Sequence, residues 1–474
     1  MPLVDGFPSM GVPNTGDTAW MLASAALVLL MTPGLAFFYG GMVRAKNVLN
    51  MIMMSISAMG LVTVLWVLYG YSLAFGNDVS GLFGNPGQFF GLKGLIGGNA
   101  AEAVIADPAN GVEAAEVVNI PLVGTIPATV FVAFQLMFAI ITVALISGAV
   151  ADRLKFGSWL LFSGLWVTIV YFPVAHWVFA FDGAAAEKGG WIANQLKAID
   201  FAGGTAVHIN AGTAGLVLAL ILGKRKGWPG TPMRPHNLPF VMLGAGLLWF
   251  GWYGFNAGSA TSSNGLAGST FVTTTVATAA AMLGWLLTER IRDGHATSLG
   301  AASGIVAGLV AITPSCSSVN VAGALAIGAI AGILCALAVG LKYKLGFDDS
   351  LDVVGVHLVG GIVGTLLIGL FAAPQTGAAV AGLFYGGGLE QLWRQALGAG
   401  AVLLYSAIGT AIVAFIVKYT IGLRISDEGE AAGADESQHA ECAYDFVALG
   451  LGSATGNFAG SPTEGRPLIS HREA

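Results

Sequence analysis

Long apolar stretches, separated by short clusters of charged and turn-forming residues, cover most of the chain. A helix needs about 20 mostly apolar residues to cross a bilayer. Eleven stretches meet this requirement, with approximate bounds 17–42, 48–75, 126–150, 157–181, 201–222, 237–260, 267–289, 297–315, 320–341, 352–373 and 391–418. Because a helix satisfies its own backbone hydrogen bonds in lipid, the pattern predicts an all-α polytopic membrane protein with eleven transmembrane helices.

The composition narrows the classes of function. Asp, Glu, Lys and Arg make up 10% of the 474 residues, whereas they make up about 25% of a typical soluble domain. The net charge of −6 argues against a nucleic-acid partner. The three cysteines are scattered along the chain and form neither a disulfide framework nor a CxxC metal motif. We therefore expect a chain embedded in a lipid bilayer, with no cofactor and no metal.

The positions of the basic residues predict an orientation. Sixteen of the 20 Lys and Arg residues lie on the side of the predicted bundle that also carries the C-terminal tail. Cytoplasmic loops carry the excess of basic residues, so the N-terminus is expected outside and the tail in the cytoplasm, in a cell (inner) membrane. The expected divisions are an extracellular N-terminus (1–16), a transmembrane domain (17–424) and a cytoplasmic tail (425–474) with a disordered end. The long turn 76–125 would be an extracellular loop.

Two histidines fall inside predicted helices and share a local motif. His208 in the fifth helix and His357 in the tenth each begin the pattern H-x3-G-x2-G. Glycines at +4 and +7 lie on the face of the histidine, so each helix presents a close-packing stripe headed by an imidazole. The fifth and tenth helices run in opposite directions, which predicts an inverted repeat of five plus five helices with a site at the interface. Asp200 precedes the first histidine by eight residues and Asp352 precedes the second by five.

The histidine pair is open to three interpretations. A single intramembrane histidine is compatible with a packing role, in which it bonds to the carbonyl of a neighbouring helix. Two at equivalent positions favour a functional pair. A metal pair is disfavoured because neither a carboxylate nor a thiolate accompanies the histidines.

Aromatic residues form three further clusters. Phe134 and Phe138, with Gln135 between them, lie at helical spacing and on their own indicate core packing. Trp249, Phe250, Trp252, Tyr253 and Phe255, followed by Ser259, crowd the outer half of the sixth helix, and His176, Trp177 and Phe179 reach the same level. These two clusters fit either an interfacial aromatic belt or a vestibule that binds a cation.

The chain also resembles a known family in sequence. The stretch Asp200-Phe-Ala-Gly-Gly-Thr-Ala-Val-His208-Ile-Asn-Ala-Gly is similar to the signature of ammonium transporters of the Amt/Mep/Rh family. The resemblance extends over nearly the whole chain, through GDTAWML (16–22), PGLAFFYGG (33–41), FQLMFAIIT (134–142), PHNLP (235–239), WFGWYGFNAGS (249–259), TPSC (313–316) and DVVGVH (352–357). It points to the bacterial Amt branch.

The resemblance implies roles for individual residues. His208 and His357 would be paired pore histidines that share a proton, and Phe138 and Phe255 would be stacked rings that gate the outer mouth. Ser259 would accept a hydrogen bond from recruited ammonium, in a site with Phe134, Gln135, Phe179 and Trp252. Asp200 would be a structural acidic residue below this site, and Asp352 is assigned the same kind of role in the second half.

The resemblance also implies an assembly and a regulatory tail. Family members are homotrimers with one pore in each protomer, and a PII-family protein commonly blocks their cytoplasmic exits. The tail residues Gly433, His439, Glu441 and Tyr444 are similar to the segment that couples subunits. The chain departs from the family pattern at Phe179, where Trp is usual, at Ala440, where Gly is usual, and at Ala434, where Leu is common.

These observations predict an ammonium transporter for nitrogen uptake, with methylammonium as a substrate analogue. Burying a bare cation in an apolar pore costs far more than burying neutral ammonia, and ammonium can lose a proton whereas potassium cannot. We therefore expect NH4⁺ to be deprotonated at the outer gate and NH3 to pass the histidines, with or without the proton. The alternatives are a non-selective channel for neutral gas or water and an ammonium sensor. An enzyme is not expected, because no nucleophile–base pair or metal motif is present.

Overall fold

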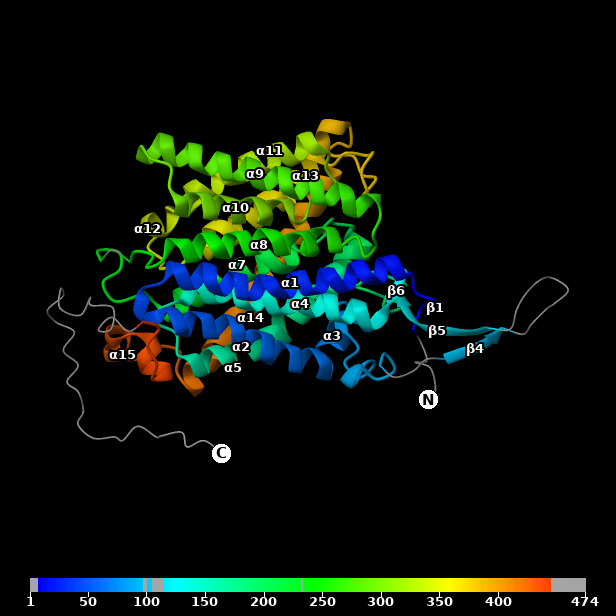
Figure 1. Cartoon of the computed structure of the whole chain (residues 1–474), viewed down its shortest axis with the longest axis horizontal. Coiled ribbons are helices and arrows are strands. Elements are labelled where there is room, and N and C mark those ends of the chain that lie inside the picture. Colours follow the sequence, from blue (N-terminus) through cyan, green and yellow to red (C-terminus); the bar gives the residue numbers. More distant parts are fainter. Residues whose placement is uncertain (1–6, 97–99, 105–114, 232, 445–474) are drawn as a thin grey trace, which may run out of the picture.

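The computed structural model describes residues 7–96, 100–104, 115–231 and 233–444, and these form stacked layers of nearly parallel helices (Figure 1). The long helices are α1 (Thr15–Met42), α2 (Val48–Leu65), α4 (Ala128–Ile146), α5 (Phe156–Trp166), α7 (Asn210–Leu222), α8 (Leu238–Gly258), α9 (Gly265–Asp293), α10 (Ser298–Ile312), α11 (Val321–Ala338), α13 (Val359–Phe371) and α14 (Glu390–Thr420). Shorter helices are α3 (Tyr71–Phe75), α6 (Phe172–Phe179), α12 (Leu341–Leu345) and α15 (Asp427–Ala432). The predicted end of the tail, beyond residue 444, lies outside the described residues.

Several π-helical segments join or begin these helices. The segment η2 (Trp66–Gly70) links α2 to α3, and η5 (Val167–Tyr171) links α5 to α6. The segments η7 (Gly204–Ile209) and η8 (Val354–Leu358) begin the two helices that carry the paired histidines. Short π-helical insertions occur frequently at functional sites.

The apolar helices agree with the predicted membrane architecture. In the part of the chain that the structure describes, ten helical stretches are long and apolar enough to cross a membrane. The predicted eighth stretch, 297–315, is helical only over Ser298–Ile312, which is shorter than the other ten. Thr313, the residue before Pro314, still has helical backbone angles (φ −50°, ψ −49°), and the chain continues beyond it as turns. The chain is therefore an all-helical polytopic membrane protein in its main body.

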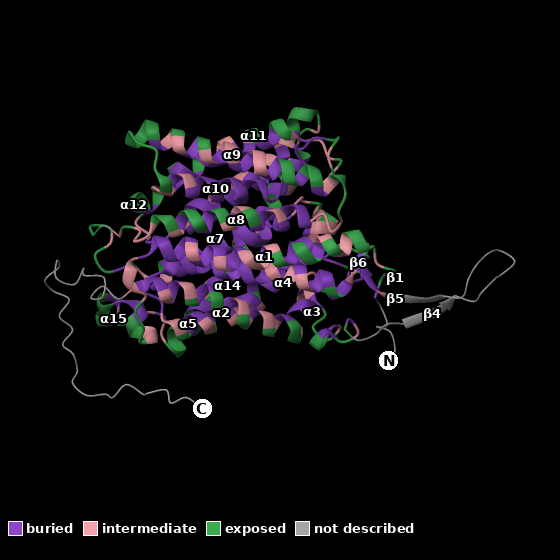
Figure 2. Ribbon diagram, viewed as in Figure 1, coloured by how far each residue is buried: buried purple, intermediate pink, exposed green. Residues whose placement is uncertain are grey.

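Burial is concentrated in the middle of the bundle. Helices α4, α7 and α10 are buried along most of their length, whereas α2, α9, α11 and α14 show exposed residues on their outer faces (Figure 2). Many of these exposed side chains are large and apolar, including Leu283 and Leu287 of α9 and Leu404 and Ile408 of α14. An exposed apolar face of this kind is what lipid requires of a membrane protein.

Short strands gather at one end of the bundle, which we call the strand end. There β5 (Ala115–Val123) pairs with β1 (Met10–Gly11), β4 (Ala100–Val104) and β6 (Ile126–Pro127), all antiparallel. A second hairpin joins β2 (Asp78–Val79) to β3 (Phe83–Gly84). We predicted only a loop over 76–125, and the β-branched run Val117, Val118 and Ile120 is the signal that favours a strand there. The opposite end, which carries α12 and α15, is called the tail end.

The two histidine helices cross in opposite directions at the centre of the bundle. The segment η7 lies against α13, and α7 lies against η8. A Cβ atom on Gly212 would lie 2.5 Å from the backbone nitrogen of Leu358, and one on Gly361 would lie 3.2 Å from Cβ of His208. The predicted close-packing glycine stripe is therefore confirmed, since only glycine leaves room for these contacts.

Candidate functional site

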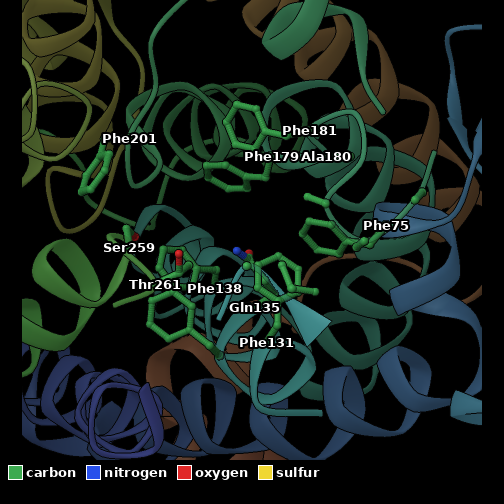
Figure 3. A pocket seen from close by; sticks show the side chains of 16 residues that line it. Phe75, Phe131, Gln135, Phe138, Phe179, Ala180, Phe181, Phe201, Ser259 and Thr261 are labelled. Atoms are coloured by element: carbon green, nitrogen blue, oxygen red, sulfur yellow. The ribbon is translucent and has the colours of Figure 1, made fainter. Parts of the chain in front are cut away.

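A cavity of about 250 Å³ opens at the strand end of the bundle. Its walls combine aromatic rings from α4, α6 and the chain after α6 with a few polar side chains (Figure 3). The lining includes Phe75, Phe131, Phe134, Gln135, Phe138, Phe179, Phe181, Phe201, Ser259 and Thr261. Of the five residues predicted for substrate recruitment, the structure brings four together here: Phe134, Gln135, Phe179 and Ser259.

Ser259 presents an acceptor to this cavity. It follows the last residue of α8, and its hydroxyl donates to the carbonyl oxygen of Phe255 at 2.8 Å. The donor is therefore used within the protein, while the lone pairs of the hydroxyl oxygen stay available. A cation with N–H groups that entered the cavity would find an acceptor and several aromatic faces.

Two stacked rings close the deep end of the cavity. Phe138 of α4 and Phe255 of α8 have ring centroids 4.2 Å apart and an interplanar angle of 29°. Both side chains are almost fully buried. Phe134 and Phe179 meet Phe138 edge-on, at 4.9 and 6.2 Å between centroids. This packing holds Phe138 in place from two sides, so passage beyond the cavity requires the stacked pair to move.

The paired histidines lie beyond the stacked rings. The ring of His208 lies 6.1 Å from that of Phe255, and its Nδ1 lies 3.4 Å from Nδ1 of His357. Such a contact holds one proton, because one nitrogen must donate and the other accept. Nε2 of His208 is buried and has no hydrogen-bond partner among the described residues.

A small apolar space adjoins the histidines. Its volume is about 10 Å³, which is close to the size needed for one water-sized molecule. Apart from the two imidazoles and the indole of Trp252, its lining is aliphatic or phenyl: Met31, Leu35, Ile141, Leu145, Val207, Leu248, Phe255 and Val306. Such walls disfavour a charged species strongly and a neutral one only modestly.

Trp252 lies deeper than we predicted. Its ring stacks on His208 at 5.4 Å, and its Nε1 donates to the hydroxyl of Thr313 at 2.8 Å. It does not line the strand-end cavity that contains Ser259. The reason is helical geometry, since seven residues along α8 amount to about 10 Å. The structure therefore places Trp252 beside the histidines, and its role in recruitment stays a prediction.

Asp200 caps the first histidine helix. Its carboxylate accepts from the backbone N–H groups of four residues, Gly203, Gly204, Thr205 and Ala206, at 2.6–3.1 Å, and from the hydroxyl of Thr205. A carboxylate at a helix N-terminus satisfies otherwise unpaired donors. These capping contacts fit the structural role that we expected of Asp200.

In the second half the helix is capped by Asp349, which we did not predict; Asp352, for which we predicted a structural role, lies three residues further on. Asp349 accepts from the backbone nitrogens of Val353 at 3.1 Å and Val354 at 2.7 Å, at the start of η8. It precedes His357 by eight residues, the spacing between Asp200 and His208. This repeated spacing is the sequence signal that was missed. Asp352 instead forms an ion pair with Lys342 at 2.7 Å.

Asp349 is fully enclosed, and this changes its titration. Burial raises its pKa from 3.8 to about 6, although Lys342 and the two backbone donors act in the opposite direction. Lys342 donates to the Asp349 backbone carbonyl at 3.0 Å while it pairs with Asp352. The tail-end cap thus differs from Asp200 in having a charged neighbour.

A buried ionic cluster lies at the tail end. Arg225 bonds to Asp348 at 2.8 Å and to Asp152 at 3.2 Å, and Arg153 donates to the Asp348 carbonyl at 2.6 Å. Burial alone would raise the pKa of Asp348, but the bonds from Arg225 outweigh it and hold the pKa below 3.8. The cluster fixes the turns that join α4 to α5, α7 to α8 and α12 to η8.

The tail packs against these turns. Asn47 accepts from the backbone nitrogen of Ala434 at 2.7 Å and donates to Asp152. Asp435 accepts from the backbone nitrogen of Asn50 at 2.8 Å, close to the start of α2. Burial raises the pKa of the Asp435 carboxyl, and the backbone donors of α2 oppose this. Neither contact was expected from the sequence, because both join segments more than 380 residues apart.

Each of the four predicted tail residues makes a different contact. Gly433 has φ +126°, and a Cβ there would lie 2.6 Å from the Lys46 carbonyl oxygen. His439 bonds to the Asn50 side chain at 3.1 Å. The Glu441 backbone nitrogen donates to the Asp435 carbonyl at 3.3 Å, and the Tyr444 hydroxyl lies 2.9 Å from Nε2 of His236.

Comparison with known proteins gives a consistent result. The model of the Ammonium Transporter Family matches residues 19–444. An ammonium transporter of Mycobacterium tuberculosis is 77% identical over 450 residues, covering 94% of this chain and 93% of the relative. An ammonium transporter of Aquifex aeolicus is 49% identical, with 91% and 94% covered. Among solved structures, Saccharomyces cerevisiae Mep2 is similar with a TM-score of 0.76, 34% identity and 88% of each chain covered.

Proposed function

Because the chain belongs to the ammonium transporter family and is a transporter rather than an enzyme, we propose how it handles its substrate. NH4⁺ is recruited in the aromatic cavity and gives up a proton at the Phe138–Phe255 pair. NH3 then passes His208 and His357, and the proton follows through the paired imidazoles, so that charge crosses the membrane. The observation that carries this proposal is the order of the three parts. A cavity with an acceptor and aromatic faces is separated by two stacked rings from a narrow apolar space with paired imidazoles.

The recruitment step rests on matched chemistry. Ammonium is a small cation with four donors, so it gains from the faces of aromatic rings and from the free lone pairs of Ser259. Potassium has no proton to donate to Ser259. Gln135 provides a further polar side chain in the same cavity. These groups favour ammonium in a site that still contacts water.

The transfer step rests on the cost of desolvation. Beyond the stacked rings the walls are apolar, and a bare cation would lose its hydration with little compensation. Ammonia loses only a few hydrogen bonds. The shared proton of the histidine pair leaves nitrogen positions that can donate to or accept from a passing ammonia molecule.

We also propose the orientation and the internal symmetry. The strand end faces outside and the tail end faces the cytoplasm, because the basic residues concentrate at the tail end. The two halves form a five-plus-five inverted repeat, supported by the eight-residue spacing of Asp200 to His208 and of Asp349 to His357. The domain limits 1–16, 17–424 and 425–474 follow from this arrangement.

By family resemblance, we further propose a homotrimer that a PII-family protein regulates from the cytoplasmic side. Contacts of the tail support a regulatory role. Asn47 joins Ala434 to Asp152, which in turn joins Arg225, so the tail is connected to the turn that contains Asp349. Movement of the tail would therefore reach the start of the His357 helix.

The recruitment site is tested by ammonium-dependent current in proteoliposomes. Ser259→Ala removes the acceptor, so the half-saturating ammonium concentration should rise about tenfold or more, because a hydrogen bond to a charged group is lost. The maximal current should change little. Ser262→Ala is the matched control, since Ser262 donates to the Ala260 carbonyl and does not line the cavity.

Unchanged half-saturation in Ser259→Ala would contradict recruitment at this cavity. It would favour the non-selective neutral channel, which needs no outer cation site. Ammonium binding without any flux would favour the sensor instead.

A further inference from the structure

His176 lies beside the strand-end cavity without lining it. It belongs to α6, and its side chain is fully buried. Its Nδ1 lies 3.0 Å from the carbonyl oxygen of Ala74, and its Nε2 lies 3.1 Å from a carboxylate oxygen of Asp78. The two contacts join α6 to α3 and to β2.

The nature of these two partners decides how the ring is protonated. A backbone carbonyl has no proton to donate, and an ionised carboxylate only accepts. The ring can donate to both partners at once only when each of its nitrogens carries a proton, as in an imidazolium beside the Asp78 carboxylate. A neutral imidazole has one N–H and would give up one of the two bonds.

Among the described residues, Asp78 is the charged side chain that contacts His176. The other titratable side chains facing α6 are Tyr71 of α3, Tyr171 of η5, His208 of η7 and Tyr405 of α14, and none of them bonds to His176. Lys188 meets Asp78 through its backbone carbonyl, which accepts from the Asp78 nitrogen at 3.0 Å.

The bonded segments form two walls of the cavity. Ala74 directly precedes Phe75, and His176 precedes Phe179 by one helical turn, so the bonds of His176 connect the supports of both rings. Figure 3 shows Phe75 and Phe179 on separate segments around the cavity. Trp177 adds a bond from its Nε1 to the Leu82 carbonyl at 2.8 Å, which holds the β2–β3 hairpin to α6.

We propose that His176 is a positioning residue for substrate recruitment: as an imidazolium bonded to Asp78 and Ala74, it fixes the spacing of Phe75 and Phe179 around the cavity. The proposal rests on the recruitment role assigned to this cavity above. Loss of the ring proton breaks one of the two bonds and loosens the wall. Affinity for external ammonium then falls, while the stacked rings and the paired histidines remain intact.

The test measures ammonium currents in proteoliposomes at several external pH values, with a full titration of the NH4⁺ concentration at each pH. In the wild type, half-saturating ammonium should rise with external pH, because only the ring with two N–H groups bonds to both segments. His176→Gln offers one amide donor group in place of two ring donors, and Asp78→Asn removes the balancing charge. Both variants should raise the half-saturating ammonium concentration about tenfold at low pH and leave the maximal current unchanged. In both, the half-saturating concentration should no longer depend on pH. His295→Gln, an exposed histidine at the tail end, should behave as the wild type.

Several results would overturn the proposal. A wild-type half-saturation that does not vary with pH excludes an imidazolium role, and an Asp78→Asn variant indistinguishable from the wild type excludes the ion pair. Asp78 is partly exposed, so this variant gives an answer even if His176→Gln does not fold. If Ser259→Ala weakens affinity while the His176 and Asp78 variants do not, only the present inference fails. If Ser259→Ala also has no effect, recruitment at the cavity itself fails.

Discussion

His208 and His357 meet through their Nδ1 atoms at 3.4 Å, although they lie 149 residues apart in the chain. The contact exists because the helices that carry them cross in opposite directions over their own glycines. Gly212 lies against Leu358, and Gly361 lies against His208. The histidine pair is therefore a product of backbone packing as much as of side-chain chemistry.

The glycine crossing gives the first prediction. In Gly212→Ala, the new methyl group would lie 2.5 Å from the Leu358 nitrogen, so the crossing must open at a cost of about 1–3 kcal/mol. Gly246→Ala in α8 is the matched control, since nothing lies within 4 Å of the added carbon. Thermal unfolding in detergent should show a lowered midpoint for Gly212→Ala alone, together with a loss of ammonium current. Equal stability of the two variants would contradict the tight crossing.

The cavity gives a second prediction, at the position where the family usually has tryptophan. Phe179 lines the cavity, and indole is a stronger partner than phenyl in a cation–π contact, which is worth about 0.5–1 kcal/mol at exposed sites. Phe179→Trp should therefore lower half-saturating ammonium about two- to fivefold at unchanged maximal current. Phe90→Trp, an exposed change at the same end, should have no effect. A raised or unaltered half-saturation in Phe179→Trp would show that this ring does not contact the cation.

The cap of the second histidine helix gives a prediction about pH. Burial raises the pKa of Asp349 to about 6, above its usual 3.8, so the folded state favours the neutral acid. The contribution of Asp349 to wild-type stability should then fall as pH rises from 4 to 6, by up to about 3 kcal/mol, and level off above that range. Asp349→Asn carries no charge, so its stability relative to the wild type should increase over the same range.

Asp293 provides the control for this measurement. Arg292 lowers the pKa of Asp293, which is exposed, so Asp293→Asn should show a small effect of opposite sign. Urea unfolding of detergent-solubilised protein at several pH values measures both differences. A pH-independent difference between wild type and Asp349→Asn would contradict the burial of an ionisable carboxyl at this cap.

The tail gives a fourth prediction. Ala440 has φ +55°, a left-handed conformation that costs a residue with a Cβ about 1 kcal/mol. Ala440→Gly should therefore strengthen docking of the tail by about 1 kcal/mol and slow its cleavage by protease. Ala432→Gly, at the end of α15, should instead weaken docking, because glycine destabilises a helix. Faster cleavage of Ala440→Gly would contradict the docked conformation.

Local periodicity predicted much of this structure. The apolar stretches gave the helices, and the glycines at +4 and +7 from each histidine gave the close crossing, because both features depend on residues that are near one another in sequence. The stacking of Phe138 on Phe255 was available only through family resemblance, since their meeting depends on how α4 and α8 are placed in space.

The depth of individual side chains also depends on how the helices are placed in space. Asp352 is the acidic residue nearest to His357 in the sequence, whereas the backbone turn before η8 brings Asp349 to the free N–H groups. Trp252 and Ser259 lie close together in the sequence, although two helical turns separate their depths. Asn47 bonds to Ala434, and Asp435 bonds to Asn50, so each contact joins segments more than 380 residues apart. Such contacts leave no pattern in the local sequence.

We propose that the pore accepts ammonium and rejects a bare cation such as potassium, with the paired histidines carrying the transfer. The most direct test records currents in proteoliposomes after jumps of ammonium and of potassium, in the wild type and in the double variant His208→Ala, His357→Ala. We predict current with ammonium and none with potassium in the wild type, and no ammonium current in the double variant. Potassium current in the wild type, or full ammonium current in the double variant, would contradict the account.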